Sequence, residues 1–150
     1  MNLVKNKELN RHEIRIKALQ SLFPLDFNVD LTKDAAIQNA LSMDDFDVLD
    51  DDDEKFTPPY LDTLVTGVIE QKSSIDEIIT KHLTKNWSLK RISKMDLIIL
   101  RLAIFEMMYQ KEEVDAKIAV NEALELAKAF SDENSTRFIN GVLDNVLRNI

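Results

Sequence analysis

Hydrophobic residues recur along this chain at spacings of three and four, the period of an α-helix, and no stretch alternates convincingly as a strand would. The first such stretch follows Asn10, which is suited to cap a helix. Its apolar residues form two stripes: Ile14, Ala18, Leu22 and Leu25 on one side, and Ile16, Leu19 and Phe23 on the other. Because Pro24 disfavours helical backbone at the preceding residue, we expect this helix to kink or end at Phe23.

Two more helices are expected on either side of an acidic stretch. The first covers residues 32–42, and the second begins at the TPP sequence, with Thr57 as cap and Pro58 in the first turn. The core face of the second helix consists of Leu61, Leu64, Val65 and Val68. Between them, DDFDVLDDDDEKF at 44–56 lacks the glycine and the distal glutamate of a calcium loop, which favours a solvated acidic loop.

The next two helices have recognisable start signals. Ser74 is placed to cap a helix that carries Ile75, Ile78, Ile79 and Leu83. The sequence SKMD at 93–96 has the spacing of a capping box, with Asp in place of the usual Glu or Gln. It opens MDLIILRLAIFEMM, which is apolar nearly all round, so we expect a central helix wrapped by the others.

The last two helices complete an all-α fold of about seven helices in one domain, residues 1–150. Asp115 is expected to cap a helix that reaches about Phe130. The final helix places Phe138, Ile139, Val142, Leu143 and Val146 on one side. Gly141 lies inside it at a cost of about 1 kcal/mol relative to Ala, which suggests that another backbone approaches closely there.

Composition narrows the class of protein. With 150 residues, 45% of them hydrophobic, the chain can bury a sizeable core without disulfides or metals. It contains no cysteine, which excludes a disulfide scaffold, a thiolate metal site and a cysteine nucleophile. No segment has the ~20 apolar residues of a membrane span, and no apolar run follows the basic N-terminus as in a signal peptide. We therefore expect a cytoplasmic protein that does not enter a membrane.

The negative charge is concentrated in one part of the chain. Residues 30–55 carry a net charge of -8, which equals that of the whole chain, whereas residues 1–20 carry +3. The overall acidity therefore argues against nonspecific polyanion binding by the whole molecule, but it leaves room for an anion site on the first helix.

Residues with catalytic chemistry are scarce. His12 and His82 are the only histidines, and neither has a carboxylate or second ligand four residues later. Gly67 and Gly141 are too few and too far apart for a phosphate-binding loop. We therefore expect no enzymatic activity, no metal and no cofactor.

The basic first helix and two aromatics leave two interpretations open. From periodicity alone Phe23 and Phe138 are favoured as ordinary core residues, and the cations as a solvated helix end. Together they also fit an arrangement in which cations hold phosphates while an aromatic face stacks an unpaired base. Composition does not decide between the two.

Several stretches resemble the NusB family of transcription antitermination factors. These are LRLAIFEM at 100–107, IAVNEALELAKAF at 118–130 and FINGVLDNVL at 138–147, together with the R-x-x-x-R-x-x-ALQ-x-LF pattern at 11–23. The match spans both ends of the chain and is poor at about 27–57. The resemblance implies an all-helical protein with two helical bundles packed on a shared core.

The resemblance also implies a function and a site. Members of the family bind the boxA segment of nascent ribosomal RNA transcripts together with NusE, a protein of the small ribosomal subunit, as part of the transcription elongation complex. Arg11, His12 and Arg15 would then meet phosphates, and Phe23, Asn134 and Phe138 would lie on the RNA-facing surface. Asp96 matches an acidic position near the contact with the protein partner.

Departures from the family pattern keep two alternatives open. Glu13, Ile16 and Pro24 make the first helix less basic and less regular, which favours a runner-up: a helical module that binds only protein and has lost RNA affinity. A third reading is an RNA-modifying enzyme, because related helical domains precede methyltransferase domains. The chain has no cofactor-binding half, so this reading ranks low.

Overall fold

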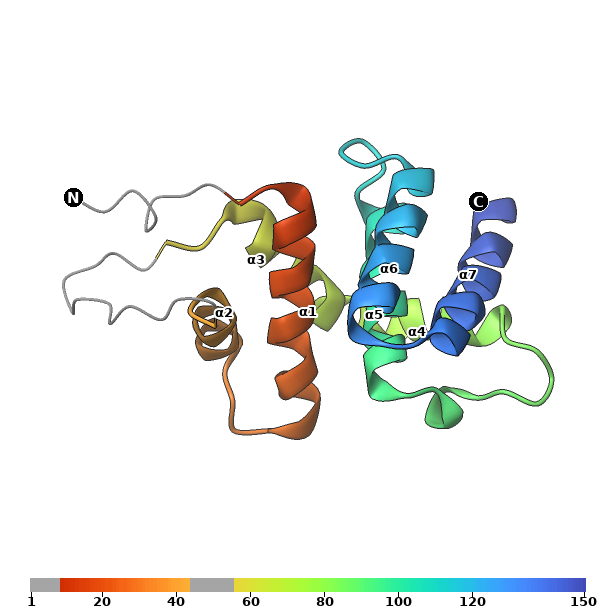
Figure 1. Cartoon of the computed structure of the whole chain (residues 1–150), viewed down its shortest axis with the longest axis horizontal. Helices are drawn as coiled ribbons and strands as arrows, with labels where there is room; N and C mark the ends of the chain where they lie inside the picture. The colour runs from red at the N-terminus through yellow and green to blue at the C-terminus, as the bar shows by residue number, and fades with distance from the viewer. Residues whose placement is uncertain (1–8, 44–55) are drawn as a thin grey trace. The chain divides into compact units, whose positions relative to one another are not determined.

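The computed structural model describes residues 9–43 and 56–150, and these residues form helices and connections without a strand. The seven α-helices are α1 (Arg11–Phe27), α2 (Lys33–Leu41), α3 (Pro59–Glu70), α4 (Lys72–Lys81), α5 (Lys94–Tyr109), α6 (Ala116–Phe130) and α7 (Glu133–Arg148), and a 3-10 helix, η2 (Leu89–Arg91), precedes α5. Figure 1 shows them in chain order. The predicted all-helical class and the count of seven are confirmed for the described residues.

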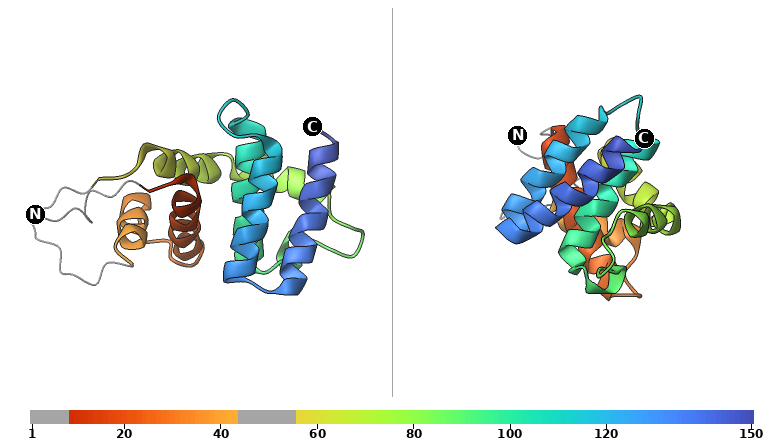
Figure 2. Two further views of the ribbon diagram at one scale, coloured as in Figure 1. Left: turned by 45° about the horizontal axis from the view of Figure 1, so that its top comes forward. Right: turned by 90° about the vertical axis from the view of Figure 1, so that its right-hand side faces the viewer.

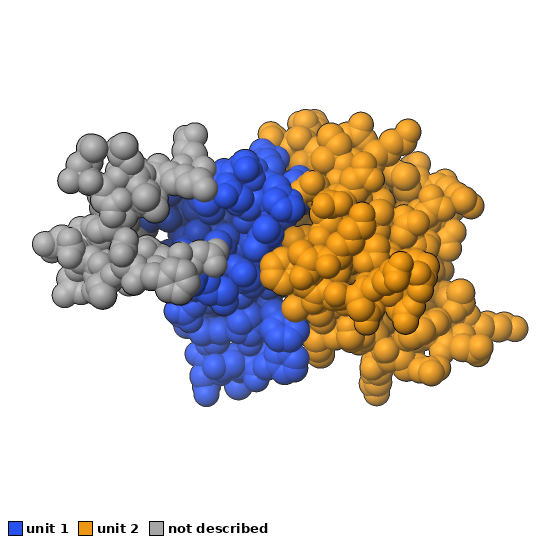
Figure 3. All heavy atoms as spheres, in the orientation of Figure 1, with its two compact units in different colours: residues 1–65 blue, residues 66–150 orange. Residues whose placement is uncertain are grey.

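The chain divides into two compact units, residues 1–65 and 66–150, coloured separately in Figure 3. The boundary falls inside α3, so the first unit holds α1, α2 and the start of α3, and the second holds the rest. One domain with a shared core stays a prediction.

The first unit is built on α1 and α2, which lie side by side. Small and branched residues make the contact close, because Ala18, Ala36 and Ala40 are almost fully buried beside Leu19 and Ile37. Polar contacts join α2 to the start of α3: Lys33 Nζ lies 3.3 Å from Asp62 Oδ1, and Gln38 Nε2 donates to Thr57 Oγ1 at 3.0 Å.

The second unit is organised around α5. Residues 96–107 are all buried, as expected for a helix that is apolar nearly all round. Consecutive helices α5, α6 and α7 lie side by side and run in opposite directions (Figures 1 and 2). Against α5, α6 buries Ala119, Ala123 and Ala127, while α7 buries Ile139 and Leu143. The predicted central helix is confirmed.

An ion pair joins α4 to α5. Arg101 Nε donates to Asp76 Oδ1 at 2.9 Å, and Arg101 Nη2 donates to Oδ2 at 3.0 Å, so the guanidinium grips both carboxylate oxygens. Arg101 is 5% exposed. The ion pair therefore fixes α4 to α5. The connection between these two helices is also held in place by the buried side chain of Ile92.

Of the two outcomes expected at Pro24, a kink or an end of the first helix, the end does not occur, and the predicted start of the third helix is wrong. The first helix does not end at Phe23 but continues to Phe27, and the Asn28 amide donates to the Pro24 carbonyl at 3.1 Å. Pro24 removes one amide donor, yet the ladder resumes beyond it. The third helix begins at Pro59 and not at Pro58, so Thr57 is not its cap, and the Thr57 hydroxyl accepts from Gln38 instead.

Ser74 and Gly141 were also misassigned. The fourth helix begins at Lys72, and Ser74 lies within its first turn, because the Ile75 amide already donates to the Gln71 carbonyl at 2.9 Å. Gly141 is exposed, and a Cβ built on it would meet nothing within 4 Å, so the expected close crossing is absent at this position. The acidic segment 44–54 lies outside the described residues.

Candidate nucleic-acid interface

The basic start of α1 lies at the surface. Asn10 and Glu13 form a capping box: the Asn10 side chain accepts from the Glu13 amide at 2.8 Å, and the Glu13 carboxylate accepts from the Asn10 amide at 3.0 Å. Arg11 and His12 are exposed, and the Arg11 guanidinium lies 3.7 Å from the centre of the Tyr60 ring. Stacking on Tyr60 restricts the Arg11 side chain without neutralising its charge.

Two other cations of α1 are buried. Arg15 is 5% exposed and Lys17 is 6% exposed, against the expectation of a solvated basic helix. Long cationic side chains can bury their stems while other groups satisfy the head. The exposed positive charge at the start of α1 is therefore smaller than the sequence suggests, and it comes from Arg11, with the polar ring of His12 exposed beside it.

Phe23 lies two turns beyond Arg15 and is partly buried. Its ring packs against Phe27, with centroids 5.0 Å apart and planes at 56°. Phe27 is 62% exposed, and it lies one turn from Phe23 because α1 continues past Pro24. The pair presents an aromatic surface at the C-terminal end of α1.

The second predicted group lies on α7. Asn134 is exposed in the first turn, and its carbonyl oxygen accepts from Arg137. Phe138 is partly buried, and its ring packs against Trp87, with centroids 5.1 Å apart and planes at 38°. Sequence reasoning missed Trp87, although it is the only tryptophan in the chain and lies in a basic stretch.

The structure brings the predicted RNA residues together as two groups. Arg11, His12, Arg15 and Phe23 belong to α1 in the first unit, whereas Asn134 and Phe138 belong to α7 in the second.

Asp96 serves as a buried acceptor at the start of α5. Its two carboxylate oxygens accept from Ser131 Oγ at 2.8 Å and from Ser135 Oγ at 2.6 Å, and the residue is 6% exposed. Ser93 caps α5 by accepting from the Asp96 amide at 3.2 Å, as predicted. The Asp96 carboxylate, however, does not close a capping box and instead fixes the turn between α6 and α7.

Replacing Asp96 with Asn should lower the free energy of unfolding by about 1 kcal/mol. Both serine hydroxyls keep a partner, but two charge-assisted hydrogen bonds become neutral ones. Asp115→Asn is the matched control, because Asp115 caps α6 from an exposed position where Asn is an equally good cap. Urea denaturation of the two variants measures the difference, and equal stabilities would show that the Asp96 charge contributes nothing.

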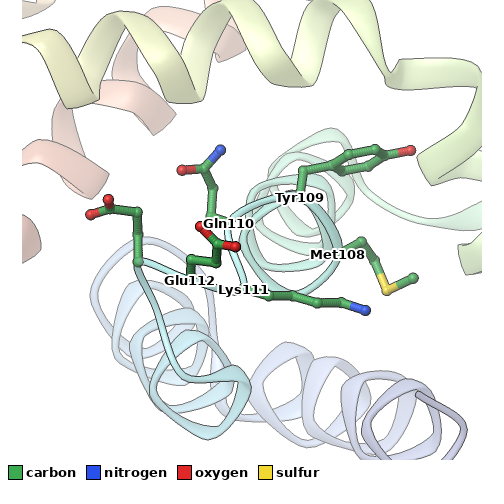
Figure 4. Close-up of a pocket in the computed structure, with 6 residues that line it drawn as sticks. Met108, Tyr109, Gln110, Lys111 and Glu112 are labelled. Carbon is green, nitrogen blue, oxygen red and sulfur yellow. The ribbon is translucent and has the colours of Figure 1, made fainter.

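Other potential sites are weak. In the described part of the chain, no group of three or more His, Asp or Glu side chains is arranged to hold a metal ion. An open hollow of about 330 Å³ lies at the C-terminal end of α5, and its lining comes from the six consecutive residues 108–113 (Figure 4). Among residues 9–43 and 56–150, no helix is long and apolar enough to cross a membrane.

Comparison with known proteins gives one consistent result. A family model described as the NusB family matches residues 12–148. The chain is 55% identical over 143 residues to the transcription antitermination protein NusB of Enterococcus faecalis, which covers 95% of this chain and 92% of that protein.

Solved structures agree in fold. NusB of T. maritima superposes with a TM-score of 0.77 at 29% identity, covering 95% of this chain and 93% of that chain. A chain from the crystal structure of the antitermination factors NusB and NusE in complex with dsRNA superposes with a TM-score of 0.76, covering 93% of this chain and 97% of that chain. Its identity is 23%, so this second likeness shows the fold alone.

Proposed function

The chain belongs to the NusB family of transcription antitermination proteins, and we propose that it binds the boxA segment of nascent ribosomal RNA together with NusE. The observation that carries this proposal is the exposed pair Arg11 and His12 at the capped start of α1, in a chain with a net charge of -8. A local cationic surface attracts phosphates even on a protein whose overall charge is negative.

Membership of this family confirms that the protein is not an enzyme. Its proposed role is that of an adaptor that carries RNA and NusE into the transcription elongation complex, in the cytoplasm. A structural relative has been crystallised with NusE and RNA, which supports both partners.

The proposed RNA residues have different tasks. Arg11 and His12 contact phosphates from the exposed start of α1, and Arg15, which is 5% exposed, reaches a phosphate only when its side chain turns outward. Phe23 and Phe138 offer ring faces to unpaired bases, with Asn134 beside Phe138 on α7. Asp96 acts near the protein contact by holding the turn at Ser131 and Ser135, since its own oxygens are occupied.

A second function is favoured by one observation. The burial of Arg15 and Lys17 leaves less exposed charge on α1 than an RNA-binding helix usually presents. This favours a module whose RNA affinity depends on NusE, or one that binds protein alone. Measuring RNA binding with and without NusE separates the two, because a protein-only module gains no RNA affinity from its partner.

Changing Arg11 to Ala should flatten the salt dependence of binding to boxA-containing single-stranded RNA by about 0.7 log units per log unit of salt. Each phosphate contact releases counterions from the RNA, and the variant makes one such contact fewer. If Arg15 also contacts a phosphate, the double variant Arg11→Ala, Arg15→Ala should show a salt dependence that is flatter by about 1.4 log units per log unit of salt. It should also be less stable, because Arg15 is buried. Fluorescence anisotropy at several salt concentrations gives the slopes.

Arg148→Ala is the matched control, since Arg148 is an exposed arginine at the far end of α7 and outside the proposed site. NusE should bind all three variants, because its contact is proposed near Asp96. An Arg11 variant that keeps both its affinity and its slope would remove α1 from the RNA site.

A further inference from the structure

A second basic surface lies on the connection between α4 and α5. Residues 81–94 contain five Lys or Arg and no Asp or Glu, the opposite of the chain's overall balance. Lys85, Lys90 and Arg91 are all exposed. This positively charged stretch, in a protein of net charge -8, attracts a polyanion and repels a basic partner.

The connection is folded by its own hydrogen bonds. The Trp87 amide donates to the Thr84 carbonyl at 3.0 Å, and the Arg91 amide donates to the Ser88 carbonyl at 3.0 Å, where η2 begins. The Arg91 guanidinium donates to the Asn86 carbonyl at 2.5 Å. Tryptophan and arginine are thus held in a defined arrangement before any ligand binds, which lowers the entropy cost of binding.

Trp87 is an aromatic platform within this basic stretch. Its ring packs against Phe138 of α7 and remains 42% exposed, while the Arg91 guanidinium lies 5.4 Å from the ring centre. An exposed indole flanked by cations is the combination that single-stranded nucleic acids recognise, because bases stack on the ring and phosphates pair with the cations. Phe138 supports the indole from one side and orients it.

We propose that Trp87, Arg91 and Lys90, backed by Phe138, form a stacking platform that holds an unpaired base and its adjacent phosphates of the bound RNA. This inference rests on the proposed function and extends it to residues outside α1. It also assigns Phe138 a supporting role beneath Trp87 in addition to its own exposed edge. Base stacking tolerates many sequences, so the platform contributes affinity and positions the strand without reading it.

The single tryptophan makes the test direct. A short single-stranded RNA containing boxA, labelled at one end, is titrated into the full chain, and label anisotropy and tryptophan emission are followed in the same samples. Stacking on Trp87 should quench the emission with the same dissociation constant that anisotropy reports.

Trp87→Leu should raise the dissociation constant roughly 5- to 100-fold while leaving the salt slope unchanged, because a stacking contact is lost and no charge is removed. Arg91→Ala should instead reduce the salt slope by about 0.7. Tyr109→Leu is the matched control: Tyr109 is an aromatic residue of similar exposure, 41%, and it lies at the C-terminal end of α5, outside the stretch 81–94. Circular dichroism confirms that each variant is folded.

These measurements distinguish a failure of the proposed Trp87 platform from a failure of the proposed RNA-binding function. RNA that binds without quenching, and binds Trp87→Leu as tightly as the parent, overturns the platform and leaves the RNA-binding function standing. RNA that fails to bind even with NusE present overturns both. Emission that changes with NusE alone and not with RNA makes this surface a protein contact, which also overturns the platform.

Discussion

Replacing Asp76 with Ala should lower the free energy of unfolding by about 2–4 kcal/mol. The change leaves the Arg101 guanidinium, which is 5% exposed, without the carboxylate that accepts two of its hydrogen bonds. Breaking a buried pair by removing one partner typically costs 3–5 kcal/mol. We expect somewhat less here, because the Asp76 side chain is 19% exposed and water can reach the vacated position.

Urea denaturation measures this loss, and Asp62→Ala is the control. Asp62 also pairs with a cation on a neighbouring helix, but that pair is solvent-exposed and should contribute no more than about 1 kcal/mol. Adding Arg101→Met to the Asp76 variant should recover part of the loss, because an apolar side chain replaces a buried charge that has lost the Asp76 carboxylate. Equal losses in the Asp76 and Asp62 variants would contradict the structural role of this pair.

Gly67→Ala should destabilise the protein by about 1–3 kcal/mol, whereas Gly141→Ala should stabilise it by up to about 1 kcal/mol. Both glycines lie inside helices, so Ala improves helix propensity at each. A Cβ on Gly67, however, would overlap Cζ and Cε1 of Phe105, a residue that is 4% exposed and whose ring stacks on Tyr109. A Cβ on Gly141 would meet nothing within 4 Å.

Thermal and urea unfolding of the two alanine variants tests the opposite signs. A third variant, Phe105→Leu, supplies a double-mutant cycle, because a smaller side chain makes room for the new methyl group. In that background Gly67→Ala should cost less than it does alone. A Gly67→Ala variant as stable as the parent, or more stable, would show that the Phe105 ring moves aside at no cost.

Helical periodicity and local capping signals sufficed to predict the helical class and most of the elements. Apolar residues at spacings of three and four predicted the buried faces of α3 and α7, and the run at 95–108 predicted the buried helix α5. Local capping signals at Asn10, Ser93 and Asp115 predicted three helix starts correctly. These signals succeed because a helix start depends on hydrogen bonds between residues two to four apart, which the sequence displays directly.

The misplaced boundaries arose where one local signal competed with its surroundings. Pro24 predicted a kink or an end, and the end did not occur, since one missing donor does not prevent the next turns from forming. Ser74 could cap a helix only if the preceding residues were not already helical, and Lys72 and Ser73 are. In both cases the outcome depended on neighbouring turns and packing, which no single residue reports.

Tertiary structure alone decided which side chains are exposed. Arg11 and Arg15 lie one turn apart in the sequence pattern, yet one is exposed on Tyr60 and the other is buried. Gly67 and not Gly141 contacts a neighbouring helix, and Trp87 meets Phe138 across more than fifty positions of sequence. Helical periodicity states which residues share a face, but only packing between distant segments states what covers that face, because the contacts of the core join residues that are far apart in the chain.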